Sequence, residues 1–133
     1  MLDSRMLDVQ FEEVTEKIIG CAFEVHKYLG NGFQEVIYQR ALACEFVRGG
    51  IAFEREIECD IFYKDLSTAI GTRRADFVVE GKVLVELKAV AGLEAVHHAQ
   101  LLNYLKAYKL QVGLLLNFGT KSLQLRRQVL TFK

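Results

Sequence analysis

The sequence predicts a single α/β domain covering residues 1–133, in which a mixed sheet is flanked by helices. Three observations predict it. Apolar residues recur every three or four positions over the first part of the chain, as on the buried face of a helix. After residue 50 they alternate with polar residues, as in half-buried strands. A further helical pattern then precedes a run that is nearly all apolar, as in a crossover to a parallel strand.

Two helices come first in this interpretation. An apolar stripe predicts a helix over about residues 10–29, and the sequence Gly-Asn-Gly at residues 30–32 ends it. A second helix is expected over about residues 33–48, where Gly49 and Gly50 end the pattern. Residues 1–9 are a candidate flexible N-terminus of the same domain.

Strands follow the helices. Alternation predicts a long, half-buried strand over about residues 51–63. A second strand is expected over residues 70–79 and a third over residues 82–89, joined as a hairpin around Glu80 and Gly81.

The last third of the chain fits a helix and two strands. The helix is expected over about residues 93–109. Residues 112–118 predict a strand buried on both faces, placed parallel to its neighbour by a right-handed crossover. Residues 122–131 are expected to form a final strand near an edge of the sheet.

The hairpin places charged residues together. If the apolar faces of its two strands meet one core, paired residue numbers must sum to an even value and the loop must hold an odd number of residues. A three-residue loop that ends in Gly81 satisfies this condition. Asp76, Glu86 and Lys88 then project from one face, with opposite or diagonal partners about 5–8 Å apart. The apolar faces are formed by Ala75, Phe77 and Val79 in one strand and by Val83, Val85, Leu87 and Ala89 in the other.

Two carboxylates and a lysine on one sheet face suit metal-assisted cleavage of a phosphodiester. Carboxylate oxygens bind Mg²⁺, for which Mn²⁺ can substitute. The metal polarises the phosphate and lowers the pKa of a bound water, which Lys88 can orient. The ordinary alternative is a surface salt bridge, between Glu86 and Lys88 or between Asp76 and Arg74. The otherwise apolar strand argues against it, because charges there are costly unless they are paired or bind a ligand.

Polar residues on two of the predicted helices are further candidates. Glu35 and Tyr38 lie three positions apart and are neighbours on a helix surface. Gln100 and Tyr104 form a polar line with His97 on the last helix. Each has an ordinary structural alternative, since Glu35 could complement a helix N-terminus and the tyrosines could be core aromatics with hydroxyls in water.

Residues 32–38, Gly-Phe-Gln-Glu-Val-Ile-Tyr, match the pattern that gives the GxxExxY protein family its name. The resemblance covers nearly all of the chain from residue 14 to residue 127. The sequence therefore resembles this branch of the PD-(D/E)XK nuclease superfamily, and its Gln-x-x-x-Tyr element resembles the RecB-like subset. The other segments that carry the resemblance are residues 15–30, 74–90, 98–106 and 113–119.

The resemblance implies a restriction-endonuclease-like α-β-β-β-α-β core and Mg²⁺-dependent hydrolysis of nucleic acid, with DNA favoured over RNA. By this resemblance Asp76, Glu86 and Glu35 would hold the metal and Lys88 would position the attacking water, so these four are the expected catalytic residues. Ala75 stands where a proline often precedes the aspartate, a departure that the superfamily tolerates. The expected substrate-binding residues are Gln100, Tyr104, Tyr38 and Arg74.

The composition limits how such a protein could act. Seventeen basic residues balance seventeen acidic ones. The net charge of zero excludes a protein that binds nucleic acid mainly by bulk charge, and leaves a local basic groove open. No apolar run approaches the roughly 18 residues of a bilayer span, and no secretory signal is visible. We therefore expect a cytoplasmic protein without a membrane partner.

Other classes of function remain open. A catalytically silent protein of the same fold could bind or scaffold, as a homodimer or with a protein partner, and zero net charge favours this because a stand-alone nuclease gains affinity from phosphate contacts. A cysteine–histidine nucleophile is a weaker alternative, since Cys21 and His26 are five positions apart and share a helix face poorly. A zinc site lacks ligands.

Overall fold

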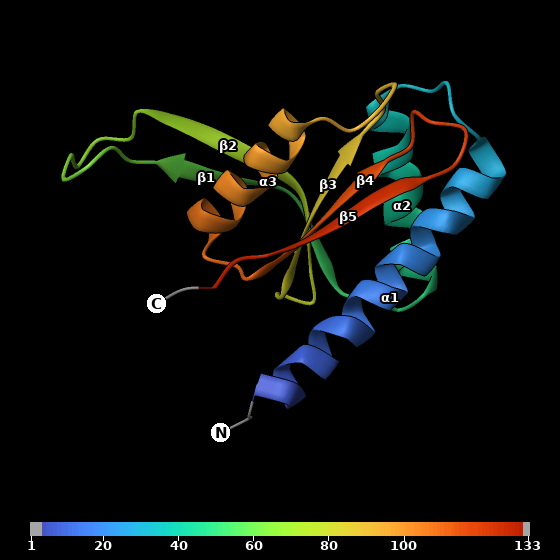
Figure 1. Ribbon diagram of the computed structural model, residues 1–133, viewed down its shortest axis with the longest axis horizontal. Helices are drawn as coiled ribbons and strands as arrows, with labels where there is room; N and C mark the ends of the chain where they lie inside the picture. The colour runs from blue at the N-terminus through green and yellow to red at the C-terminus, as the bar shows by residue number, and fades with distance from the viewer. Residues whose placement is uncertain (1–3, 132–133) are drawn as a thin grey trace.

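The computed structural model describes the backbone of residues 4–131 and the side chains of residues 11–131. It contains a mixed five-stranded sheet in the order β1-β2-β3-β4-β5, with α1 and α2 on one face and α3 on the other (Figure 1). The expected fold class is thereby confirmed. The elements are α1 (Ser4–Leu29), α2 (Glu35–Arg48), β1 (Phe53–Ile61), β2 (Gly71–Val79), β3 (Val83–Lys88), α3 (Ala95–Tyr108), β4 (Val112–Asn117) and β5 (Gln124–Val129).

Helix α1 buries the stripe that the sequence indicates, through Val14, Ile18, Ala22 and Val25. It begins at Ser4 rather than near residue 10, and so takes up part of the segment considered as a flexible N-terminus. Residues 1–3 of that segment lie outside the described residues. Within the described part of the chain, no helix combines the length and the apolar character that crossing a bilayer would require.

The sheet pairs largely as the sequence predicts. β3 and β4 are parallel neighbours connected through α3, and β5 is an antiparallel edge strand. The β2–β3 turn consists of residues 80–82, so Gly81 lies at its centre rather than at its end. Val79 pairs with Val83, which keeps the paired numbers at an even sum. Glu80 and Gly81 both have positive φ, a conformation that glycine adopts without steric cost.

The prediction that Ala75 shares a face with Phe77 and Val79 is wrong. Phe77 and Val79 pack with α1 and α2, whereas Ala75 packs under α3 with Leu84. The change of face occurs where Asp76 lies opposite Glu56, whose φ of 53° falls in the left-handed region. Both strands change face at this point. The outer half of the β1–β2 hairpin, nearer its turn, therefore faces α3, while the inner half, farther from the turn, faces α2.

Candidate active site

β2 and β3 separate where the two predicted carboxylates lie. Their ladder runs from Val79↔Val83 to Phe77↔Val85 and stops there. Beyond it, side chains replace the backbone pairing. The Asp76 N–H donates to Glu86 Oε1 at 3.0 Å, and the Leu87 N–H donates to Asp76 Oδ2 at 2.8 Å. Asp76 and Glu86 therefore lie across from each other at the opening of the sheet.

Glu35 and Lys88 complete a cluster of four charged side chains. Glu35 is the first residue of α2 and the most accessible of the four, and Lys88 is the last residue of β3. Desolvation and then the Asp76 carboxylate raise the pKa of Glu35, while Lys88 acts in the opposite direction. The structure thus brings together all four residues that the sequence indicates as catalytic, from α2, β2 and β3.

Burial makes the carboxylates of Asp76 and Glu86 hard to ionise. Burial, followed by the neighbouring Asp76, raises the pKa of Glu86 to about 9, against the opposing effects of the Asp76 N–H and Lys88. Burial also raises the pKa of Asp76, although the Leu87 N–H, Gln39, Glu86 and Lys88 all lower it. Burial thus disfavours the charged forms of both groups, and the Asp76 carboxylate adds to this effect at Glu86.

Gln39 is a member of the site that sequence reasoning missed. Its Nε2 donates to Asp76 Oδ1 at 2.7 Å, and its Oε1 accepts from Arg55 Nε at 3.2 Å. Arg55 can only donate, so it fixes which end of the Gln39 amide faces the carboxylate. The signal was present in the sequence, because Gln39 follows Glu35 by four positions and shares its helix face.

The donor set fits a hard divalent cation. Asp76 and Glu86 offer carboxylate oxygens, the ligands that Mg²⁺ and Mn²⁺ prefer, and a bound cation would offset the burial that raises their pKa values. Among the described side chains, no three carboxylate, imidazole or thiol groups are gathered as a ready-made metal site. Asp76 and Glu86 are therefore the two central candidate ligands, with Glu35 beside them.

Comparison with known proteins identifies the family. A model of the PD-(D/E)XK nuclease superfamily matches residues 12–129. The chain belongs to this superfamily. A solved structure titled "Crystal structure of SSO0001" is similar, with a TM-score of 0.60 and 22% sequence identity over 74% of this chain and 52% of that chain. The chain thus spans about half the length of that protein, and at this identity the likeness shows the fold alone. No curated protein matches the chain.

Within this PD-(D/E)XK chain, Tyr38 does not take the substrate-binding position expected of it. Its side chain is fully buried and stacks on Phe118. Its hydroxyl donates to Gly30 O at 2.6 Å and accepts from the Phe33 N–H at 3.2 Å. The prediction is wrong because both capacities of the hydroxyl are used to fix the loop before α2, which positions Glu35.

Arg74 also lies apart from the cluster. It forms an exposed salt bridge with Glu58 on β1, with Nη2 and Oε1 2.8 Å apart. The hydrogen bond that Arg74 donates to Glu58 raises the pKa of Arg74. The ordinary surface pairing that the sequence allowed for Arg74 is thus observed, with Glu58 rather than Asp76 as its partner.

Helix α3 brings one of its two expected residues towards the site. The Tyr104 hydroxyl has a pKa raised by burial and then by the charge of Glu86, which Arg73 opposes. Gln100 is exposed one turn earlier on the same helix face, and no hydrogen bond of its side chain is found within residues 11–131. His97 is engaged at the start of the helix, where its Nδ1 accepts from the Glu94 N–H at 2.9 Å.

Asn117 anchors the segment that leaves β3 after Lys88. Its Oδ1 accepts from the N–H groups of Val90 and Gly119, both at 3.0 Å, and its Nδ2 donates to Val90 O at 3.1 Å. Asn117 is fully buried at the end of β4 and pairs with Lys88. A side chain at Gly119 would overlap the Val90 backbone, so this close approach requires glycine. The edge of the site is therefore held by a packed, hydrogen-bonded junction.

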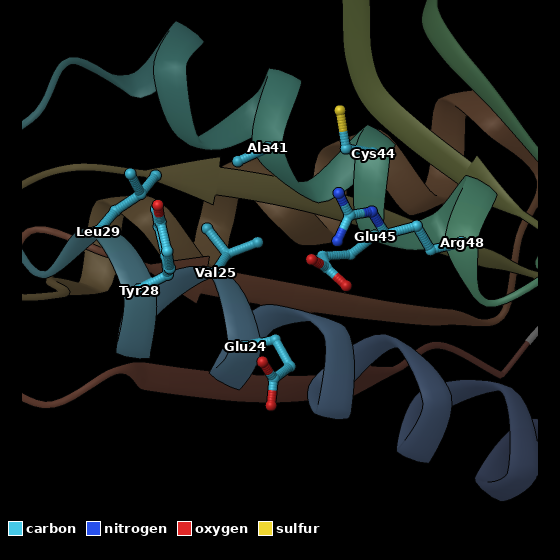
Figure 2. Close-up of a pocket in the computed structure, with 8 residues that line it drawn as sticks. All are labelled: Glu24, Val25, Tyr28, Leu29, Ala41, Cys44, Glu45 and Arg48. Atoms are coloured by element: carbon cyan, nitrogen blue, oxygen red, sulfur yellow. The ribbon is translucent and has the colours of Figure 1, made fainter.

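A separate hollow of about 530 Å³ lies between α1 and α2 (Figure 2). Val25, Tyr28 and Leu29 line it from α1, and Ala41, Cys44, Glu45 and Arg48 line it from α2, with Glu24 at its rim. None of the four clustered residues takes part in it.

The cysteine–histidine alternative finds no support on α1. Burial, then Glu45 and Glu24, raise the pKa of the Cys21 thiol, which disfavours the thiolate that a nucleophile needs. His26 Nε2 lies 2.9 Å from Thr120 O, so that ring nitrogen is engaged with the backbone.

Proposed function

We propose that this protein is a divalent-metal-dependent nuclease that hydrolyses phosphodiester bonds, with DNA favoured over RNA. The observation that carries the proposal is the opening between β2 and β3. There Asp76 and Glu86 replace the backbone ladder, and Glu35 and Lys88 lie within electrostatic reach. The family membership of the chain supports the same reaction class.

We assign the following roles in the reaction to the chain's own residues. Asp76 and Glu86 would hold Mg²⁺ or Mn²⁺, with Glu35 assisting, and the bound cation would polarise the phosphate and make a water easier to deprotonate. Gln39 holds the Asp76 carboxylate in one orientation. Lys88 would orient the attacking water or stabilise the charge that develops on the phosphate. Tyr104 would contact the substrate beside Glu86, with Gln100 one turn away.

We also propose the finer placement within the superfamily. The pattern Gly-x-x-Glu-x-x-Tyr at residues 32–38 supports the GxxExxY branch, and Gln100 with Tyr104 supports the RecB-like subset. In this placement Tyr38 has a structural task, since its hydroxyl fixes the loop that leads into Glu35. The chain would form one cytoplasmic domain.

A second candidate function is a silent protein of the same fold that acts as a scaffold, as a homodimer or with a protein partner. Two observations favour it. The net charge is zero, and large apolar side chains, including Phe23 and Tyr28 on α1, remain exposed. The two candidates differ in whether Lys88 matters for turnover.

A cleavage screen separates them. Wild-type protein is incubated with single- and double-stranded DNA and RNA in Mg²⁺ or Mn²⁺. Lys88→Ala should fold normally and lower the rate by roughly 10²- to 10³-fold, the loss typical of one electrostatic donor. Lys82→Ala is the matched control, because Lys82 lies in the turn of the same hairpin and is also partly buried. Absence of cleavage of every substrate, or equal rates for wild type and Lys88→Ala, would favour the scaffold.

Metal binding is tested by calorimetric titration with Mg²⁺. Asp76→Asn should weaken binding because it removes a charge from the central pair of ligands. Asp65→Asn is the control, since Asp65 is exposed at the tip of the β1–β2 hairpin. Equal Mg²⁺ affinity in wild type and Asp76→Asn would refute the assignment of Asp76 as a ligand.

A further inference from the structure

A second hollow lies on the α3 side of the sheet, between that helix and the outer half of the β1–β2 hairpin. Its volume is about 560 Å³. In Figure 1, α3 crosses in front of β1 and β2, and the hairpin extends beyond it. We call this hollow the hairpin groove. The lining residues that matter below are Phe62 and Arg73 from the hairpin and Tyr104, Lys106 and Lys109 from α3 and its C-terminal cap.

The charge of the hairpin groove suits a polyanion. Arg73, Lys106 and Lys109 line it, against the single carboxylate of Asp60. Among the side chains that the structure describes, none of these three cations is in a salt bridge. Their charges therefore stay available to phosphates, although the chain as a whole is neutral. The α1–α2 hollow differs, because it sets two glutamates against one arginine.

The groove also presents an aromatic side chain. Phe62 lines it and is 54% exposed, so its ring is accessible to a ligand in the groove. The next residue, Tyr63, is similarly exposed, and Lys64 Nζ lies 5.2 Å from the centre of its ring. Exposed aromatics beside cations are the combination on which unpaired bases stack, and bases inside a duplex cannot reach them.

Tyr104 joins the groove to the carboxylate cluster. It lines the groove, while Glu86 and Asp76 raise the pKa of its hydroxyl and Arg73 lowers it. The Tyr104 side chain is therefore within electrostatic reach of both the groove and the carboxylate cluster. A strand lying in the groove would meet the cluster where β2 and β3 separate.

We propose that the hairpin groove binds single-stranded nucleic acid, with its phosphates on Arg73, Lys106 and Lys109 and a base on Phe62, and leads that strand to Asp76 and Glu86. The inference rests on the proposed nuclease function, which gives the bound strand its destination. It adds the strand state of the substrate and the surface that selects it.

Binding without turnover tests the groove. Fluorescence anisotropy in EDTA compares labelled oligothymidylate and oligouridylate of about 12 nucleotides with a blunt duplex of equal length. We expect both single strands to bind more tightly than the duplex. Phe62→Ala should weaken single-strand binding roughly 5- to 150-fold, the range found for a lost stacking contact. Phe23→Ala is the matched control, because Phe23 is 51% exposed on α1 and should leave affinity unchanged.

The salt dependence tests the cations. Lys106→Gln should make the plot of log affinity against log salt shallower by about 0.7, the value for one phosphate contact on a single strand. Lys27→Gln is the control, since Lys27 also lies in the last turn of a helix but on α1. Circular dichroism melts of all four variants check that folding is intact.

Three results would overturn the inference. They are duplex binding as tight as single-strand binding, equal effects of Phe62→Ala and Phe23→Ala, and a loss of self-association in Phe62→Ala by analytical ultracentrifugation, which would make Phe62 a contact between copies. Failure of the nuclease proposal is distinguishable from failure of this inference. If only the nuclease proposal fails, no cleavage is observed, but single strands still bind through Phe62 in EDTA.

Discussion

Glu86 is the residue at which burial and charge conflict most directly. Its side chain is 8% exposed, and its pKa of about 9 lies far above the ordinary 4.5 of a glutamate. In the unfolded chain the same group would ionise near its ordinary value. Folding therefore favours the protonated form, and between the unfolded pKa of 4.5 and the folded pKa of about 9 each step up in pH makes the metal-free native state less stable relative to the unfolded chain.

This conflict predicts the pH dependence of stability. In EDTA, the melting temperature should fall as the pH rises from about 5 to 9, because the stability present below the unfolded pKa is lost up to the folded pKa. Glu86→Gln should flatten this dependence, while Glu54→Gln, on the exposed surface of β1, should leave it unchanged. Thermal melts at several pH values measure it. A wild-type melting temperature that rises over this range would contradict the assignment.

At the level of single residues, the prediction succeeded where it depended only on whether paired residue numbers sum to an even or an odd value. Asp76 and Glu86 could be grouped from the sequence because the apolar pattern demands an even pairing sum, and the observed sum is even. Tyr38 and Gln39 could not be separated in the same way. They are adjacent on α2, and only the packing of α2 against the sheet turns Tyr38 to Phe118 and Gln39 to Asp76.

At the scale of elements, the hairpin of β1 and β2 shows that an alternating sequence pattern does not reveal where a strand changes the face that it buries. Both halves of each strand alternate correctly, so the sequence predicts one continuous face. The left-handed φ of Glu56 changes the face without adding a residue, and Glu56 is not a residue that signals such a conformation. The outer half of the hairpin then packs under α3, where the Cys59 thiol contacts Ala107 O at 3.4 Å.

Two glycines, one inside α1 and one in the loop after β4, should respond oppositely to an added methyl group. Gly20 lies inside α1 with nothing near its Cβ position, so Gly20→Ala should stabilise the protein by roughly 0.5–1 kcal/mol. Gly119→Ala should destabilise it by about 1–3 kcal/mol, because the new atom would overlap the Val90 backbone. Urea denaturation midpoints give both values. Equal shifts would show that the β3–β4 junction is looser than described.

At the scale of the whole molecule, the order of elements could be predicted and the distribution of charge could not. Each helix and strand follows from a local period, and the parallel β3–β4 pair follows from its crossover through α3. The neutral total hides a basic groove under α3 and an acidic hollow between α1 and α2. Which charges gather depends on which distant elements pack together.

The junction at which Asn117 holds the segments that leave β3 and β4 affects how the molecule exchanges its amide hydrogens with solvent. The N–H groups of Val90 and Gly119 lie outside every helix and strand, yet both bond to a buried side chain. They should therefore exchange with deuterium as slowly as amides of β4, and Asn117→Ala should release them selectively. Slow exchange would then extend beyond the secondary structure at this corner, and β3, β4 and the loops that follow them would open and close as a single unit.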